Sequence, residues 1–138
     1  MTTSLTDVRT VGIPVRDQDA AASFYVDTLG FELRLDAPIS DTQRWVEVAP
    51  PGAATSIALV SGPDAPPPGV DTGVRFAVGD VQAEHQRMAD RGVTVGELLT
   101  WPGVPPMFTF DDPDGNRFYV VGATRAPRCA LSSSLRPT

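Results

Sequence analysis

The chain contains no lysine, one cysteine, one histidine and no long apolar segment. Cys129 has no second cysteine to pair with, so an intrachain disulfide is excluded. The apolar runs, such as residues 57–60, are far shorter than the roughly 20 residues that a membrane-spanning helix needs. Residues 1–7 carry neither a basic segment nor an apolar one, so we expect no signal peptide and a cytoplasmic location.

Acidic residues outnumber basic residues by 17 to 11, and the net charge is −6. Nucleic-acid binding depends on basic side chains that neutralise phosphates, so this balance predicts no nucleic-acid partner. The short apolar runs predict no membrane partner. The acidic charge leaves two interpretations open, because it either keeps the protein soluble or favours a cationic ligand. The length of 138 residues, 41% of them hydrophobic, fits one folded domain.

An internal repeat organises the chain. Residues 11–17 and residues 74–80 both place apolar side chains at alternating positions and end in an aspartate, Asp17 or Asp80. Alternation of this kind predicts a strand. An aspartate after it predicts the N-cap of a helix, because its carboxylate accepts hydrogen bonds from free amides of the first turn.

The segments after each aspartate repeat the same order of elements. Helices are expected over residues 18–28 and 81–91, and Gly30 and Gly92 follow them at a position suited to a left-handed backbone. Extended segments then follow in each half: 31–35, 43–49 and 56–60, and later 93–98, 107–110 and 117–121. The sequence therefore predicts an α+β protein built from two β-α-β-β-β modules.

The predicted boundaries follow composition. Residues 61–72 are rich in proline, which fixes φ and cannot donate to a sheet, so they predict a stiff linker. Module one then spans residues 8–60 and module two residues 73–122, within a single domain over residues 1–122. Residues 123–138 show no periodicity and are expected to form a flexible tail.

Four short motifs connect this pattern to a known family. They are residues 13–17 (IPVRD), 24–31 (FYVDTLGF), 78–81 (VGDV) and 112–116 (DPDGN). In this order, with the repeat between them, the chain resembles the vicinal oxygen chelate superfamily, which includes glyoxalases, extradiol dioxygenases and bleomycin-resistance proteins. The resemblance implies a curved sheet in each module, an open cleft formed by the two sheets, and a homodimer.

The resemblance also implies where metal ligands stand in metal-dependent members. The corresponding positions here hold Thr10, Gly73 and Tyr119, with Glu47 on a middle strand of the first module. Glycine has no ligand atom in its side chain, and threonine and neutral tyrosine are poor ligands for a divalent metal. Glu47 alone does not hold a tight site, so we expect no metal and no cofactor.

The single histidine, His85, falls on the same face of the second predicted helix as Val81 and Met88. We expect its ring to pack against the back of the sheet. A histidine metal site or a Ser-His-Asp triad would need this residue in the cleft, so the pattern speaks against both.

Strand alternation assigns a set of side chains to the cleft. The set consists of Thr10, Trp45, Glu47, Arg75 and Tyr119. Trp45 and Tyr119 offer flat apolar area for stacking, whereas Glu47 and Arg75 orient polar groups of a ligand. Two alternatives stay open: Trp45 fills the core or a dimer seam, and Glu47 forms a structural ion pair with Arg75.

A second aromatic segment, residues 100–108, contains three prolines and is expected to be a stiff loop. Trp101 on this loop is expected to cover the mouth of the cleft, with Met107 or Phe108 beneath it. The alternative is a loop that packs against a partner subunit.

These features predict a metal-free protein that binds a small molecule without transforming it. The ligand is a planar or cationic drug or metabolite, sequestered in an aromatic cleft as in antibiotic resistance of the bleomycin type. The alternative is a lyase, isomerase or dioxygenase-like enzyme in which Glu47 serves as general base or metal ligand. No other catalytic residue is expected.

Overall fold

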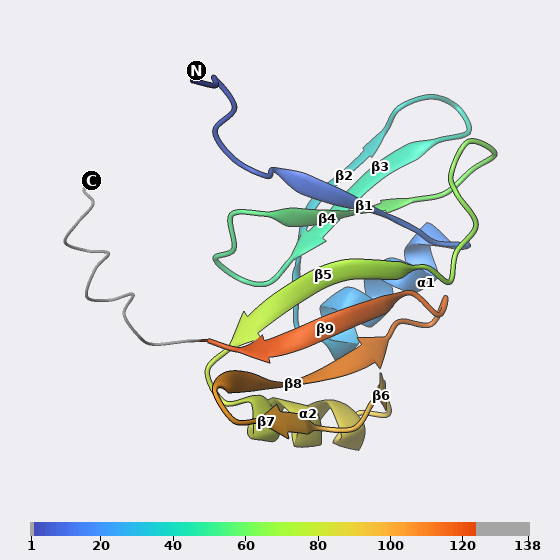
Figure 1. Ribbon diagram of the computed structural model, residues 1–138. Helices are drawn as coiled ribbons and strands as arrows, with labels where there is room; N and C mark the ends of the chain where they lie inside the picture. The colour runs from blue at the N-terminus through green and yellow to red at the C-terminus, as the bar shows by residue number, and fades with distance from the viewer. Residues whose placement is uncertain (1, 124–138) are drawn as a thin grey trace. The chain divides into compact units, whose positions relative to one another are not determined.

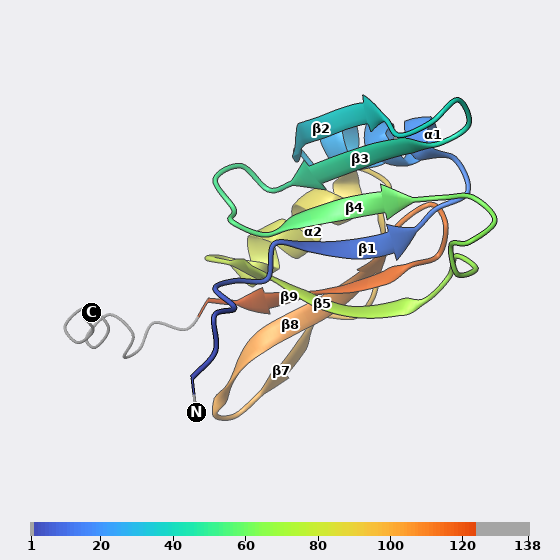
Figure 2. The ribbon, with the colours of Figure 1, turned by 90° about the horizontal axis from the view of Figure 1, so that it is seen from above.

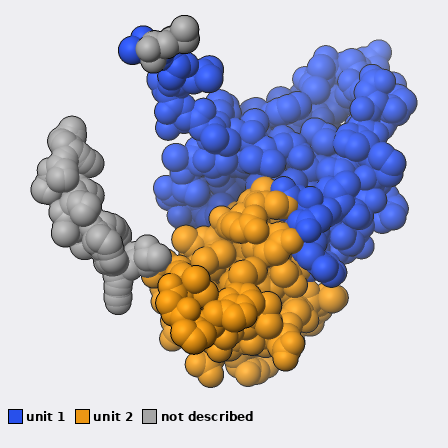
Figure 3. All heavy atoms as spheres, viewed as in Figure 1, with its two compact units in different colours: residues 1–72, 111–117 blue, residues 73–110, 118–138 orange. Residues whose placement is uncertain are grey.

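The computed structural model describes residues 2–123 and divides into two compact units. Unit 1 comprises residues 2–72 and 111–117, and unit 2 comprises residues 73–110 and 118–123 (Figure 3). The hairpin of residues 111–117 therefore groups with unit 1, although the sequence placed it in the second module. Except for Ala123, the predicted tail lies outside the described residues, and so does Cys129.

Unit 1 contains a four-stranded sheet in the order β1-β4-β3-β2. Its elements are β1 (Thr10–Pro14), α1 (Gln18–Ser23), the π-helix η1 (Phe24–Thr28), β2 (Glu32–Pro38), β3 (Arg44–Ala49) and β4 (Ser56–Val60). β1 runs parallel to β4, and the β4-β3-β2 pairs are antiparallel (Figure 2). This order confirms the β-α-β-β-β pattern predicted for the first half of the α+β fold.

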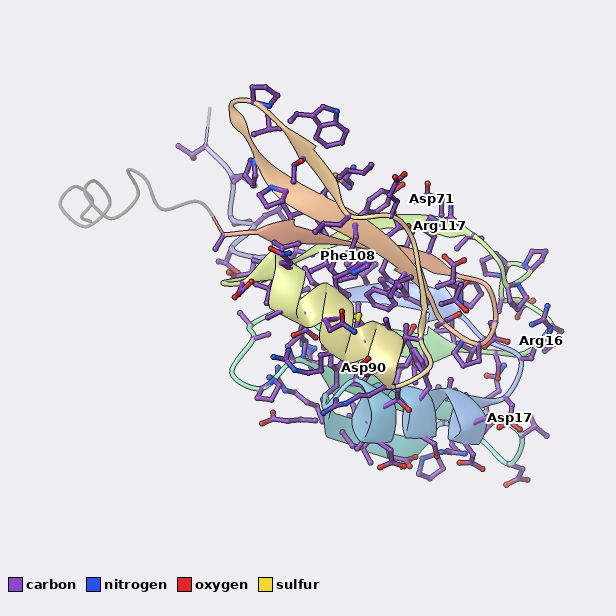
Figure 4. The ribbon with its side chains drawn as sticks, turned by 90° about the horizontal axis from the view of Figure 1, so that it is seen from below. Arg16, Asp17, Asp71, Asp90, Phe108 and Arg117 are labelled. Atoms are coloured by element: carbon purple, nitrogen blue, oxygen red, sulfur yellow. The ribbon has the colours of Figure 1, made fainter. Side chains whose placement is uncertain are left out.

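The aspartate cap predicted for the first helix is present. The Asp17 carboxylate accepts hydrogen bonds from the amides of Asp19 and Ala20, at 2.9 and 3.1 Å, where α1 begins (Figure 4). The helix predicted over residues 18–28 is present, but its second half, η1, is a π-helix. There Leu29 N–H donates to the carbonyl of Phe24, five residues back, which is the wider turn of a π-helix.

The back of the unit 1 sheet forms an apolar core with α1. Val46 and Val48 of β3 are buried, and so is Leu59 of β4. The Gln18 side chain ties the helix to this sheet, because its Nε2 donates to the carbonyls of Arg44 and Leu59 at 2.9 and 2.8 Å. These contacts fix the position of β3, including the side chains on its opposite face.

The 111–117 hairpin is fixed by a buried polar cluster. The Tyr25 hydroxyl donates to Oδ2 of Asp112 at 2.7 Å, and Asn116 Nδ2 donates to the same oxygen at 3.0 Å. Oδ1 of Asp112 accepts from the backbone amides of Asp114 and Asn116, both at 2.9 Å. Burial and the neighbouring Asp112 raise the pKa of Tyr25 far above its usual range, so its hydroxyl stays a donor.

Asn116 extends this cluster to two other segments. Its Nδ2 donates to the carbonyl of Pro14 at the end of β1, at 2.8 Å. Its Oδ1 accepts from the amides of Gly69 and Val70 at the end of the linker, at 2.9 and 3.1 Å. The DPDGN motif therefore joins β1, η1 and the linker within unit 1.

Unit 2 is built on a five-stranded sheet in the order β5-β9-β8-β6, with β7 pairing to β8. Its elements are β5 (Asp71–Val78), α2 (Val81–Asp90), β6 (Thr94–Val95), β7 (Leu99–Trp101), β8 (Val104–Asp111) and β9 (Arg117–Gly122) (Figure 1). Asp80 caps α2 by accepting from the Ala83 amide at 3.0 Å, as predicted.

Of the predicted strand over residues 93–98, only β6 (Thr94–Val95) is a strand, and β7 begins beyond it at Leu99. Gly96 lies between them and approaches β8 closely, with its N–H donating to the Thr109 carbonyl at 2.7 Å. A Cβ at Gly96 would lie 2.5 Å from Thr109 Oγ1, so no side chain fits there without a shift. This close approach interrupts the strand, and hydrophobic alternation does not reveal it.

The predicted loop of residues 100–108 is also different in the structure. β7 and β8 form an antiparallel hairpin in which Leu99 pairs with Met107 and Trp101 pairs with Val104. The register shifts between these two pairs, and the prolines at 105 and 106 fall within the shift. Proline has no backbone N–H to donate to a neighbouring strand, and it is tolerated at such an irregularity.

Three stacked rings form the centre of unit 2. Phe76, Phe110 and Phe118 lie with ring centroids 5.3–6.3 Å apart. His85 packs edge-on against Phe108 at 4.8 Å, and its Nε2 lies 2.8 Å from the Gly96 carbonyl, which confirms the packing role expected for this residue. Among residues 2–123, no helix combines the length and apolar character required to cross a bilayer.

Candidate functional site

The open face of β3 in unit 1 brings Trp45 and Glu47 into direct contact. The indole Nε1–H of Trp45 donates to Oε2 of Glu47 at 2.7 Å. The two residues are two positions apart on one strand, so their side chains share a face, as alternation predicted. Glu47 is only 5% exposed, whereas Trp45 is half-buried.

Neighbouring strands complete the surroundings of Glu47. Ser56 at the start of β4 donates from Oγ to Oε1 of Glu47 at 2.8 Å. Thr10 pairs with Ser56 in the parallel β1–β4 ladder, and their hydroxyl oxygens lie 3.0 Å apart. Thr10, Trp45 and Glu47, all predicted site residues, are thus assembled in one hydrogen-bonded group together with Ser56, which the sequence did not single out.

This group keeps Glu47 ionised. The hydrogen bond from Trp45 is the largest cause that holds the pKa of Glu47 below its ordinary value of 4.5. The Ser56 hydrogen bond and the charges of Arg9 and Arg34 act in the same direction, while burial opposes them. The result is a fixed negative charge at neutral pH, and a weak base.

A pocket of about 590 Å³ opens beside Glu47. Its lining residues are Thr6, Asp7, Arg9, Arg34, Leu35, Glu47, Ala54 and Ser56. Three of them precede β1, so the segment before the first strand forms one wall. Sequence reasoning missed this wall, because the segment has no periodicity and its proximity to Glu47 depends on the β1–β4 pairing.

Trp45 lies at the wall of a second, smaller pocket of about 280 Å³. Ile39, Val60 and Pro66 contribute apolar lining there. Trp45 lines this second pocket, and its indole N–H donates to Glu47, which lines the first. An aromatic face with apolar neighbours suits a flat ring, and a buried carboxylate suits a polar group of the same ligand.

The remaining predicted residues lie in unit 2. The Arg75 guanidinium lies over the Tyr119 ring, 4.4 Å from its centroid, and its Nη1 donates to the Gly73 carbonyl at 2.8 Å. Arg75 is exposed on β5. The pair of Arg75 with Glu47 would join the two units and stays a prediction.

The two residues predicted around the cleft mouth have different surroundings. Trp101 is 49% exposed at the β7–β8 turn. Phe108 is completely buried on β8 and packs against His85, so in the position it holds it presents no surface to a ligand (Figure 4). Phe108 lies two positions before buried Phe110 on the same strand, so both side chains face the same side of the sheet. The proline-rich loop expected in this segment did not predict that placement.

The residues around Glu47 do not fit a divalent metal. Glu47 supplies one carboxylate, whose two oxygens already accept hydrogen bonds from Trp45 and Ser56. Thr10 adds only a hydroxyl, and no group of three His, Cys, Asp or Glu side chains with metal-binding geometry occurs within residues 2–123. A tight site needs imidazole, thiolate or several carboxylates.

The fold is therefore an α+β arrangement of two sheets, with a hydrogen-bonded polar group on the open face of the first. Residues 8–120 match the Glyoxalase/Bleomycin resistance protein/Dioxygenase superfamily, and the chain belongs to it. This membership confirms the family and the fold that the sequence motifs suggested.

Individual relatives agree with this assignment. The structure of TnmS3, an antibiotic binding protein from Streptomyces sp. CB03234, is similar with a TM-score of 0.80 and 36% identity, covering 89% of this chain and 100% of that one. A superfamily member from Sphaerobacter thermophilus DSM 20745 has a TM-score of 0.82 and 35% identity, with 88% and 100% covered. YetH of Bacillus subtilis (strain 168) is 31% identical, over 82% of this chain and 95% of its own length.

Proposed function

We propose that the protein binds a planar small molecule, a drug or a metabolite, and sequesters it without chemical change. The ring stacks on Trp45, and a cationic or N–H group of the ligand meets Glu47. The observation that carries the proposal is the Trp45–Glu47–Ser56 group, which holds a buried carboxylate ionised at the wall of a pocket. The likeness to TnmS3, an antibiotic binding protein, supports the same class of ligand.

Glu47 is better suited to an anchor than to a general base. A base that abstracts protons near neutral pH works best when its pKa is raised toward that pH. The pKa of Glu47 is lowered instead, mainly by the hydrogen bond from Trp45. The enzyme alternative, with Glu47 as base or metal ligand, therefore has less support than binding.

We also propose that the protein works as a metal-free homodimer in the cytoplasm. The habit of the superfamily supports the dimer, and the donor set around Glu47 supports the lack of a metal. Light scattering on the purified protein should give twice the chain mass.

Elemental analysis should find no stoichiometric zinc, nickel, manganese or iron. About one such metal per chain, lost with EDTA, would contradict the proposal that the protein is metal-free.

The test of the binding proposal is a screen of polycyclic and glycopeptide antibiotics by quenching of tryptophan fluorescence. For ligands that bind, Trp45→Ala should weaken affinity by roughly tenfold or more, because the stacking surface and the apolar contact of the indole are lost, and about 1.4 kcal/mol corresponds to tenfold. Isothermal titration calorimetry measures the affinity of this variant, because it lacks the indole whose quenching reports binding. Leu33→Ala, at an exposed apolar residue of β2 that lines neither pocket, is the control and should retain the wild-type affinity. Hits that bind Trp45→Ala as tightly as the wild type would place the ligand elsewhere.

A further inference from the structure

Arg9 is the one cation at the Glu47 pocket whose side chain is largely exposed. Its Nη1 lies 3.6 Å from Oε1 of Glu47, a loose ion pair, and the side chain is 73% exposed. The residue lines the pocket immediately before β1. Its guanidinium therefore has N–H groups that Glu47 does not use, at a position facing the pocket.

The backbone of Arg9 is fixed independently of this ion pair. The Ser56 amide donates to the Arg9 carbonyl at 3.0 Å, which extends the β1–β4 pairing by one residue. Ser56 in turn holds Glu47 through its side chain. Arg9 and Glu47 are thus positioned by the same residue, and the Arg9 side chain can change its contacts without disturbing the sheet.

The second arginine of the pocket is committed elsewhere. Arg34 donates to the carbonyls of Ala53 and Pro50, at 2.6 and 3.1 Å, and its Nε pairs with Glu32 at 3.3 Å. These contacts tie β2 to the loop that precedes β4. Arg34 contributes charge to the pocket, but each of its three guanidinium nitrogens already makes one of these contacts.

The charges of the lining residues balance, with Arg9 and Arg34 against Asp7 and Glu47. A ligand that is only cationic is attracted by Glu47 but repelled by Arg9 beside it. A ligand that is only anionic is attracted by Arg9 but repelled by Glu47. A ligand that carries both charges satisfies both, and a carboxylate suits the planar fork of a guanidinium.

We infer that Arg9 binds an acidic group of the ligand, so that the pocket selects planar molecules carrying both a basic amine and a carboxylate. This inference rests on the proposed function and adds a specificity residue to it. Glu47 receives the amine, Arg9 turns from its loose pair to the carboxylate, and the ring lies toward Trp45. No covalent step is involved.

Three probes with one ring test this inference by isothermal titration calorimetry. They are 6-(aminomethyl)-2-naphthoic acid, its methyl ester, which retains only the amine charge, and its N-acetyl derivative, which retains only the carboxylate. The wild-type protein should bind the doubly charged acid at least tenfold more tightly than either derivative, because a charge-assisted hydrogen bond is lost in each.

Variants assign the effect to single residues. Arg9→Gln should bind the acid and the ester with equal affinity, and Glu47→Gln should remove the preference for the acid over the N-acetyl derivative. The matched control is Arg16→Gln, which removes the same charge from an exposed arginine that pairs with Asp114 at 3.0 Å and does not line the pocket. It should keep the wild-type preference.

The outcomes separate this inference from the proposed function. If the ester binds the wild type as tightly as the acid, and Arg9→Gln changes neither affinity, Arg9 does not bind an acidic group of the ligand. That result leaves the proposed binding at Trp45 unaffected. The same holds if antibiotics from the fluorescence screen bind through Trp45 and none of the three probes binds. If neither the antibiotics nor the probes bind, the proposed function fails, and the role of Arg9 fails with it.

Discussion

The indole N–H of Trp45 lies 2.7 Å from Oε2 of Glu47, two residues further along the same strand. This contact uses the polar end of the indole, and Trp45 also lines the second pocket. It also supplies the largest stabilisation of the Glu47 carboxylate. One pair therefore provides both a flat apolar surface and a fixed negative charge.

Replacing Trp45 by phenylalanine should raise the pKa of Glu47 toward its ordinary value of 4.5, because the hydrogen bond that lowers it most is lost. The measurement is an NMR titration of the glutamate side-chain carboxyl carbons, with Glu47 assigned from the Glu47→Gln variant. Trp101→Phe is the control and should leave this pKa at its wild-type value. An equal pKa in wild type and Trp45→Phe would show that the indole does not stabilise the carboxylate.

The free energy of unfolding should depend on pH through Glu47. Its pKa is lower in the folded than in the unfolded chain, so the ionised form stabilises the fold fully above about pH 4.5, and this contribution is lost as pH falls through the folded pKa. Glu47→Gln should therefore be less stable than wild type by about 1–3 kcal/mol at pH 7, with a smaller difference at about pH 3. Urea denaturation at both pH values measures it.

The control for this comparison is Glu97→Gln, at an exposed carboxylate of unit 2. It should change stability little at either pH. A difference between wild type and Glu47→Gln that stays constant from pH 7 to pH 3 would contradict the role assigned to the Glu47 charge.

Removing the Tyr25 hydroxyl should destabilise the protein. Tyr25→Phe leaves the buried Asp112 carboxylate without one of its donors, at a cost of about 1–3 kcal/mol. Asp112→Asn should cost more, because an amide would face some of the N–H groups that the carboxylate now accepts. Urea denaturation, with exposed Asp41→Asn as control, measures both, and a Tyr25→Phe variant as stable as wild type would refute this account of the cluster.

A double-mutant cycle tests the close approach of Gly96 to β8. Gly96→Ala should cost about 1–3 kcal/mol, because the new Cβ would lie 2.5 Å from Thr109 Oγ1. In a Thr109→Ala background the cost should fall below about 1 kcal/mol, since the next contacts are backbone atoms at 3.6 and 3.7 Å. Gly79→Ala, with no atom within 4 Å of its new Cβ, serves as control. Equal costs in both backgrounds would exclude the Oγ1 contact as the cause.

The periodicity of the sequence was sufficient to predict the local elements and one face of the candidate site. Asp17 and Asp80 were predicted as caps because a carboxylate after a strand has a local effect on the next helix. Trp45 and Glu47 were placed together because strand alternation has a period of two. Both inferences depend only on residues close together in the sequence.

The rest of the site depends on pairing between distant segments. Ser56 approaches Glu47 because β4 pairs with β3, and Arg9 approaches it because β1 runs parallel to β4, with Thr10 opposite Ser56. Nothing in the sequence around Arg9 indicates this register. Phe108 was misplaced for a related reason, since the prolines at 105 and 106 suggested a loop where β8 continues through a register shift.

The most direct test of binding without chemistry is the fate of a ligand that binds. An antibiotic that binds in the fluorescence screen is incubated with the protein, with the antibiotic in excess. It is then separated from the protein, and its mass is measured by mass spectrometry. We predict a saturable, stoichiometric bound fraction that is recovered with its mass unchanged, and no new species at longer times. A product that accumulates beyond the protein concentration, and that Glu47→Gln abolishes, would contradict this account and identify Glu47 as a catalytic residue.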